Sequence, residues 1–213
     1  MRKPRVLLAD DHTIVLEGLK GLLEPEFELV GAVTDGEALL KAAVETRPDV
    51  ILFDISMPLL NGIQAARELR KTNPEAKLLA LTMHAETSFV KEALRAGASG
   101  YLLKQSAATE LSTAIHEVMA GRRYLTPLIA KDVVATALKA SAEPEKTPGH
   151  LTERQLDVLR LVADGHSLKE IAYLLKISIK TVEFHKYRIM DELKIRTTAE
   201  LTAYAIRHGL TPS

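Results

Sequence analysis

The sequence predicts two domains: an α/β domain with a doubly wound, five-stranded parallel sheet, and a smaller all-α domain after it. Over roughly the first 120 residues, short apolar runs alternate with amphipathic stretches, as is typical of a parallel sheet covered on both faces. Residues 139–150, KASAEPEKTPGH, are rich in alanine, proline and charge and have no periodic apolar face. Apolar residues then recur at helical spacing, so we read 139–150 as a flexible linker between the domains.

The five apolar runs are predicted to be strands, because each is short and is followed by an amphipathic segment. The strands are Arg5–Ala9, Glu28–Val33, Val50–Asp54, Lys77–Thr82 and Gly100–Leu103. The helices that follow them are Thr13–Leu23, Gly36–Glu45, Gly62–Lys71, Thr87–Ala96 and Ala107–Ala120. Five repeats of strand and helix predict a parallel sheet with helices on both faces.

Composition excludes several classes of protein. The hydrophobic fraction of 46% and the charged fraction of 26% are ordinary for a soluble globular chain. The absence of cysteine excludes a disulfide framework and a cysteine-built zinc site. The first apolar stretch is too short for a signal peptide, and no run reaches the ~18 apolar residues of a membrane helix. We therefore expect a cytoplasmic protein with no membrane partner.

Polar side chains close four of the apolar runs. Because the carboxyl ends of parallel strands meet at one edge of the sheet, we expect these side chains to share a crevice. They are Asp10, Asp11, Asp54, Thr82 and Lys104. Taken alone, the two adjacent acids could simply cap the next helix, but five such residues at strand ends favour a common site.

That set of side chains suits phosphoryl transfer. Converging carboxylates are the ligands that Mg²⁺ prefers, and a lysine and a threonine can contact phosphoryl oxygens. Asp54 is the natural nucleophile, since a carboxylate can form an acyl phosphate. The chain has neither a phosphate-binding loop of the P-loop type nor a Gly-rich kinase loop, so the phosphoryl donor should come from outside.

Residues 5 to about 120 resemble the receiver domain of bacterial two-component response regulators. The match lies in the acidic pair Asp10–Asp11, the block DISMPLLNG at 54–62, Thr82, and Lys104 preceded by Tyr101. The resemblance implies strand order 2-1-3-4-5, a receiver domain over 1–122, and phosphorylation of Asp54 by a sensor histidine kinase.

The same resemblance implies a role for each site residue. Asp11 and Asp54 would bind Mg²⁺ directly, Asp10 through water, and Ser56 through its backbone carbonyl. Thr82 and Lys104 would contact the phosphoryl group. As a switch, the phosphorylated site would draw the Thr82 hydroxyl inward, and Tyr101 would rotate into the space vacated.

The region after the linker predicts a helix-turn-helix. Thr152 is a good N-cap for a first helix that ends at Gly165, and Ser167 can cap the short helix LKEIAYLLK. The brief turn ISI leads into KTVEFHKYRIMDELK, a second helix rich in polar and basic residues. From His150 onward basic residues exceed acidic ones by two, which permits nucleic-acid binding without requiring it.

The patterns L-T-x-R-x-x-x-V-L, D-G-x-S-x-K-E-I-A and I-S-x-K-T-V-x-x-H resemble LuxR-type DNA-binding domains over Leu151 to about Gly209. Joined to the receiver, the chain is similar to response regulators of the NarL/FixJ class, with the DNA-binding domain over 150–213. The resemblance implies that the helix from about Ile179 to Leu193 enters the major groove. The residues implied to reach phosphates are Lys180, Thr181, His185 and Lys186. The residues implied to face base edges are Glu183, Phe184 and Tyr187.

Two positions depart from the family pattern. Glu183 stands where relatives often have a basic residue; we read it as an element of sequence preference, a solvated surface acid being the alternative. Gln155 replaces the usual glutamate and should weaken a local polar contact without changing the fold.

Other assignments stay open at this stage. In this class the last helix, Thr198–His208, joins bound domains into a dimer; its apolar Leu201, Tyr204 and Ala205 fit dimerisation and internal packing equally well. Residues 123–149 would hold a linker helix, Leu125–Leu138, and the flexible linker, although a sixth receiver helix is an equal reading.

We expect a homodimer that forms on phosphorylation and binds promoter DNA at half-sites one or two helical turns apart. Two alternatives remain. An aspartyl-phosphatase of the haloacid-dehalogenase type needs an acid two residues after the nucleophile, where this chain has Ser56, so we expect no enzyme. The other is a constitutive DNA-binding regulator with a vestigial receiver.

Overall fold

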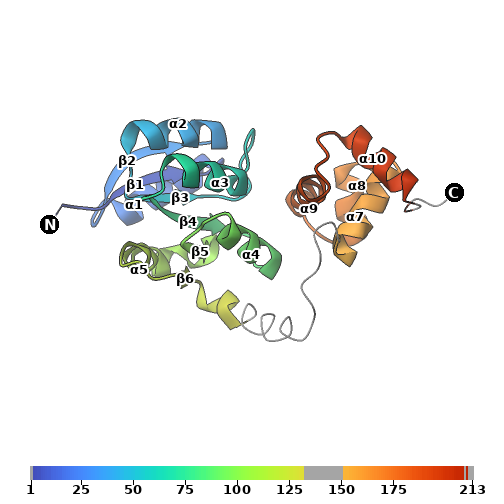
Figure 1. Cartoon of the computed structure of the whole chain (residues 1–213). Coiled ribbons are helices and arrows are strands. Elements are labelled where there is room, and N and C mark those ends of the chain that lie inside the picture. Colours follow the sequence, from blue (N-terminus) through green and yellow to red (C-terminus); the bar gives the residue numbers. More distant parts are fainter. Residues whose placement is uncertain (1, 132–150, 209, 211–213) are drawn as a thin grey trace. The chain divides into compact units, whose positions relative to one another are not determined.

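The computed structural model describes residues 2–131, 151–208 and 210 (Figure 1). The chain divides into two compact units, Met1–Glu143 and Pro144–Ser213, and each is described by itself. The predicted flexible linker at 139–150 and the second half of the predicted linker helix lie outside the described residues. Among the helices of the described part, none is long and apolar enough to cross a membrane.

The first unit is built on a parallel sheet of six strands in the order β2-β1-β3-β4-β5-β6. The strands are β1 (Arg5–Ala9), β2 (Glu28–Val33), β3 (Val50–Phe53), β4 (Lys77–Thr82), β5 (Gly100–Leu103) and β6 (Tyr124–Leu125). The predicted α/β fold and the order of the first five strands are confirmed.

The sixth strand corrects the expectation of five. β6 has only two residues, too few to show an alternating pattern, and forms by pairing with β5 in parallel. The Tyr124 amide donates to the Ser99 carbonyl at 3.3 Å, and the Thr126 amide donates to the Tyr101 carbonyl at 3.0 Å. The helix expected to begin at Leu125 therefore begins at Pro127.

Five α-helices connect and cover the strands, with bounds within one residue of those predicted. They are α1 (Thr13–Leu23), α2 (Gly36–Thr46), α3 (Gly62–Thr72), α4 (Thr87–Arg95) and α5 (Ala107–Met119). α1 and α5 share one core cluster with alternate residues of the strands, such as Leu8, Leu52 and Leu81. α2, α3 and α4 pack side by side against the opposite face, toward which the intervening strand residues point.

The start of α3 lies against the end of β3. A Cβ on Gly62 would lie 2.1 Å from the carbonyl oxygen of Asp54 and 2.7 Å from Cδ2 of Phe53. Only a glycine permits this approach, which holds the backbone at Asp54 against the helix. By contrast, a Cβ on Gly18 in α1 would meet nothing within 4 Å.

These two glycines predict opposite effects of the same substitution. Gly62→Ala should lower the free energy of unfolding by about 2 kcal/mol, because backbone rather than a flexible side chain must move. Gly18→Ala should raise it by about 0.5–1 kcal/mol, because alanine is the better helix former. Urea denaturation of both variants measures the effects, and a loss of stability in Gly18→Ala would contradict this account.

The second unit is a four-helix domain over the described residues 151–208 and 210. Its helices are α7 (Glu153–Ala163), α8 (Leu168–Leu175), α9 (Ile179–Glu192) and α10 (Thr198–Arg207). The predicted caps Thr152 and Ser167 are confirmed, each accepting from the backbone amide three residues later. Gly165 ends the first helix with φ of +86°, as glycine does without strain. The Gln155 side chain accepts from the Thr152 amide and completes that cap. The glutamine that replaces the usual glutamate therefore still makes the local polar contact.

The core of this domain answers one question that the sequence left open. Leu201 and Ala205 of α10 are fully buried in the cluster formed with α7, α8 and α9. They therefore serve internal packing. Tyr204 stacks on His208 within α10, with ring centroids 4.0 Å apart.

Candidate functional site

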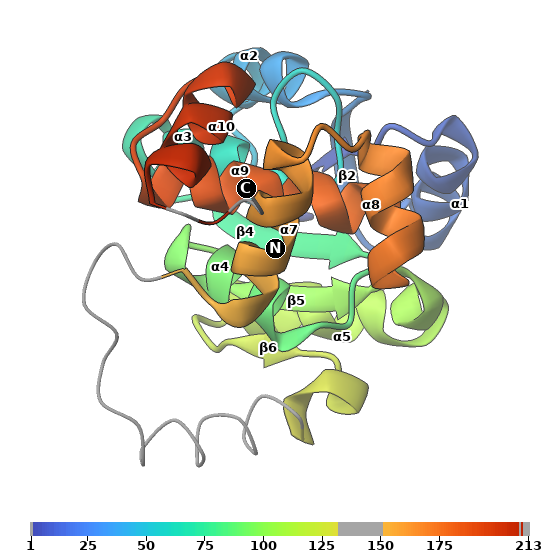
Figure 2. The ribbon, with the colours of Figure 1, turned by 90° about the vertical axis from the view of Figure 1, so that its right-hand side faces the viewer.

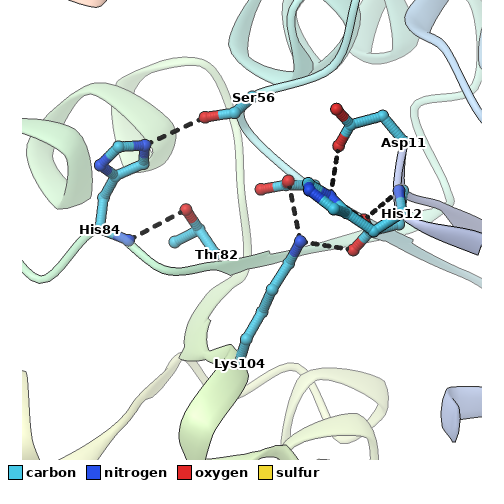
Figure 3. A network of polar contacts seen from close by, with 8 residues as sticks. Asp11, His12, Ser56, Thr82, His84 and Lys104 are labelled. Carbon is cyan, nitrogen blue, oxygen red and sulfur yellow. Dashed lines mark hydrogen bonds and ion pairs between the residues drawn. The ribbon is translucent and has the colours of Figure 1, made fainter. Parts of the chain in front are cut away.

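The carboxyl ends of β1, β3, β4 and β5 form one site (Figure 3). Asp10 directly follows β1, Asp54 directly follows β3, Thr82 ends β4 and Lys104 directly follows β5. The exposed fractions of Asp10, Asp54 and Thr82 are 1%, 3% and 0%. Because the strands are parallel and in register, four polar residues spread over 94 positions of the chain meet in one buried place.

Lys104 links two of the carboxylates. Its Nζ lies 2.7 Å from Oδ2 of Asp10 and 2.9 Å from Oδ2 of Asp54. Burial favours the neutral amine and lowers the pKa of Lys104, but the charge of Asp54 and the hydrogen bonds that Lys104 donates to Asp10 and Asp54 outweigh it. The net pKa is raised, so Lys104 is a fixed positive charge beside the carboxylate of Asp54.

Asp11 and His12 complete the acidic side of the site. One ligand atom each from Asp10, Asp11, His12 and Asp54 lies within 4.8 Å of the others. Carboxylate oxygens at this density fit a hard divalent cation such as Mg²⁺. His12 was not among the predicted site residues, although its place directly after the two acids could have drawn attention to it.

Ser56 and His84 contact each other beside the site. The Ser56 hydroxyl lies 3.0 Å from Nε2 of His84, and the His84 ring stacks on Phe89 of α4 with centroids 4.1 Å apart. The His84 amide donates to the Thr82 hydroxyl at 3.2 Å. The loops after β3 and β4 are thus joined beside the Asp54 carboxylate, a link between residues 28 positions apart that no local pattern could indicate.

Tyr101 is fully buried. Its hydroxyl donates to the carbonyl of His84 at 2.8 Å. Burial raises the pKa of Tyr101 above its ordinary value, and the negative charges of Glu86 and Asp54 raise it further.

Tyr101→Phe tests this arrangement. At pH 7 it should lower the free energy of unfolding by about 1 kcal/mol, the net value of a buried hydrogen bond. Since the folded-state pKa lies above the unfolded value near 10, the tyrosine's contribution is complete below about pH 10 and is lost as pH rises through the folded pKa. Urea denaturation at several pH values should show the two proteins converging above about pH 10. A constant difference would contradict the raised pKa.

The second candidate region is α9. Val182 and Ile189 are in the domain core, and Thr181 is 4% exposed with its hydroxyl 2.8 Å from that of Ser178, the helix N-cap. The structure thus places Thr181 at the packed start of the helix, where its side chain helps to hold the first turn.

The other predicted residues of α9 follow from helical spacing. Lys180, Phe184 and Tyr187 recur every three or four residues and share the face opposite the core. Glu183 lies beside that face, whereas His185 and Lys186, three and four residues after the buried Val182, lie toward the core side of the helix. Arg188, one turn beyond Phe184, was not predicted, although a further basic residue on this helix was visible in the sequence.

Comparison with known families agrees with both halves of the structure. The family described as "Response regulator receiver domain" matches residues 6–116. The family described as "Bacterial regulatory proteins, luxR family" matches residues 149–205. The chain is a response regulator of the NarL/FixJ class.

Individual relatives match this response regulator over nearly its whole length. UvrY of Escherichia coli K12 is 37% identical over 210 residues, covering 96% of this chain and 94% of UvrY. GacA of Pseudomonas aeruginosa is 36% identical, with 97% of both chains covered. A solved structure of RcsB from Salmonella typhimurium has a TM-score of 0.60 and 29% identity, covering 96% of this chain and 98% of RcsB. The response regulator is thus a phosphorylation-dependent, DNA-binding transcriptional regulator of a two-component system.

Proposed function

We propose that Asp54 accepts a phosphoryl group from a sensor histidine kinase, and that this event makes the protein dimerise and bind promoter DNA. The observation that carries the proposal is the position of Asp54: it is buried at the end of β3, 2.9 Å from Nζ of Lys104 and next to two further acids. This arrangement combines a nucleophilic oxygen, a fixed cation and metal-binding carboxylates in one place.

Each residue has a defined task in this reaction. A carboxylate oxygen of Asp54 forms the bond to phosphorus as the bond to the donor's histidine nitrogen breaks. Lys104 neutralises the phosphoryl oxygens, and the Thr82 hydroxyl donates to one of them. Asp10, Asp11, Asp54 and the Ser56 carbonyl would hold Mg²⁺, which supplies charge neutralisation when bound.

The switch would use the contacts around Thr82. A phosphoryl group that draws the Thr82 hydroxyl toward it competes with the His84 amide, which donates to that hydroxyl at 3.2 Å. Tyr101 is tied to the same residue through the His84 carbonyl. Phosphorylation would thereby shift the conformational equilibrium of the loop after β4. The neighbouring face formed by β4, β5 and α4 would shift with it, because it is packed against that loop.

On DNA, we propose that α9 enters the major groove. Lys180, His185 and Lys186 would contact phosphates. Thr181, at the start of the helix, would contact a phosphate only through its hydroxyl or its backbone amide. Glu183, Phe184 and Tyr187 would face base edges. A solved structure of an RcsB–DNA complex, 28% identical to this chain with a TM-score of 0.61, supports the assignment of this domain to DNA.

We assign 1–122 to the receiver, 123–149 to the linker and 150–213 to DNA binding. We propose that the protein works in the cytoplasm and has no membrane partner. We also propose that the only reaction it undergoes is its own phosphorylation, so that it is not an enzyme acting on a separate substrate.

The test is incubation with Mg²⁺ and acetyl phosphate, followed by intact mass and light scattering. The wild-type chain should gain one phosphoryl group and shift from monomer to dimer. Asp54→Ala should do neither, whereas Asp164→Ala, in the DNA-binding domain, should behave as wild type. Failure of the wild-type chain to gain mass would contradict the proposal and favour a constitutive regulator with a vestigial receiver.

A further inference from the structure

Thr126 is a buried polar residue that the proposed reaction does not use. It is fully buried between β6 and the helix that begins at Pro127, whose described residues, 127–131, we call the linker start. In this N-cap position a threonine hydroxyl commonly accepts from an amide of the helix that follows it. Here the hydroxyl accepts from the Leu103 amide of β5 at 3.1 Å. The side chain therefore joins the linker start to the strand that leads into Lys104.

The hydroxyl extends the hydrogen bonds between β5 and β6, which lie side by side at the edge of the sheet (Figure 2). The Thr126 amide donates to the Tyr101 carbonyl at 3.0 Å, and the Thr126 hydroxyl accepts from Leu103, two residues further along β5. Backbone groups normally form these evenly spaced bonds in a parallel pair. A side chain takes their place where β6 ends, so the bond depends on the identity of this one residue.

The two β5 residues bonded to Thr126 also contact the phosphorylation site. Leu103 pairs in register with Thr82 of β4, whose hydroxyl accepts from the His84 amide. Tyr101 donates its hydroxyl to the His84 carbonyl. Each of them is therefore one contact away from the residues through which the proposed switch acts.

The linker start is fixed to Thr126 in turn. The Thr126 carbonyl accepts from the amides of Ile129 and Ala130 at 2.9 and 3.1 Å, and Ile129 is 1% exposed. Pro127, at the first helical position, has no amide to donate and has a φ suited to a helix. Because a close-packed interior transmits small shifts, a movement of the end of β5 would move Thr126 and the linker start together.

We propose that Thr126 is a positioning residue that transmits the state of the phosphorylation site to the linker. The inference rests on the switch under the proposed function. Phosphorylation that shifts Thr82 and Tyr101 would shift the end of β5, and the bond from Leu103 to the Thr126 hydroxyl would carry that shift to the linker start. The two states of the site would thereby become two positions of the linker start, which is a coupling between separate places in the receiver.

Hydrogen–deuterium exchange of the full chain tests the proposal, measured in Mg²⁺ with and without acetyl phosphate. In the wild-type chain, phosphorylation should change the exchange rate of residues 127–131 about fivefold. Thr126→Val keeps the shape of the side chain but lacks the hydroxyl, and should abolish this difference. Thr126→Ser keeps the hydroxyl and should retain the difference. Intact mass should show that all three chains gain one phosphoryl group.

Ile129→Ala distinguishes transmission from simple loosening of the helix. It removes a buried side chain from the same turn and leaves the Thr126 hydroxyl in place. Exchange of residues 127–131 should become faster in both states, yet the difference between the states should persist. The matched control is Thr109→Val, which removes a hydroxyl that donates to the exposed Ser106 carbonyl and should behave as wild type.

The outcomes separate this inference from the proposed function. A wild-type chain that gains no phosphoryl group contradicts the phosphorylation site and the inference together. A wild-type chain that gains the group without a change at 127–131, or a Thr126→Val chain that responds as wild type, overturns the role of Thr126 and leaves the site standing. Loss of the response in Ile129→Ala overturns it as well, because the response would then depend on packing rather than on the hydroxyl. Thermal unfolding of each variant confirms that the fold is retained.

Discussion

Lys104→Met should lower the free energy of unfolding by about 3 kcal/mol when no divalent ion is present. Methionine keeps most of the side-chain volume but removes the ammonium that lies within 2.9 Å of both Asp10 and Asp54. Because all three side chains are at most about one-tenth exposed, the two carboxylates would be left facing each other with little solvent to screen them. Mg²⁺ should restore part of the lost stability, since it also neutralises the acids.

The same variant should take up phosphate from acetyl phosphate about a hundredfold more slowly, the usual cost of removing one charge-stabilising donor. Urea denaturation with and without Mg²⁺, together with intact mass over time, measures both effects. Lys71→Met is the control, because Lys71 pairs with Glu68 on the surface and should cost less than about 0.5 kcal/mol. Equal losses of unfolding free energy in Lys104→Met and Lys71→Met would show that the charge of Lys104 has no special role in the site.

Lys186→Ala should weaken DNA binding about tenfold on specific and unrelated DNA alike. Lysine contacts to phosphate carry no sequence information, so affinity falls uniformly, and one fewer phosphate contact reduces the salt dependence by about one unit of slope. Fluorescence anisotropy with two duplexes, one of them unrelated in sequence, at several salt concentrations measures both quantities. The phosphorylated full-length protein should be used.

A receiver variant with the same loss of charge, Lys71→Ala, serves as the control and should leave both quantities unchanged. Glu183→Gln provides a contrast, because a residue that faces base edges should change the preference at one base pair by about 1–3 kcal/mol. If Lys186→Ala instead altered which sequence is preferred, its assignment to a phosphate would be wrong.

Hydrophobic periodicity predicted the bounds of the first five strands and of the helices that follow them to within one residue. The alternation of apolar runs and amphipathic stretches depends only on which residues are buried, so strands and helices such as Arg5–Ala9 and Thr13–Leu23 were predicted to the residue. β6 was not predicted because two residues show no period, and it forms through hydrogen bonds to the carbonyls of Tyr101 in β5 and of Ser99 directly before β5.

Some features of the site also followed from the sequence, whereas others required the structure. That Asp10, Asp54, Thr82 and Lys104 meet at one edge followed from the sequence, because parallel strands place their carboxyl ends together. Periodicity does not say which partner covers a buried face, so the packing of Leu201 and Ala205 within one domain required the structure.

The sequence by itself determined the two domains, their elements apart from β6, and the polar residues at the strand ends. Only the tertiary structure decided that Lys104 bridges Asp10 and Asp54, that Ser56 reaches His84, and that the imidazole of His12 turns toward the acids. The physical reason is that a strand or helix period fixes the direction of each side chain about its own element. The few ångströms that separate a contact from a near miss are set by how distant elements pack against one another.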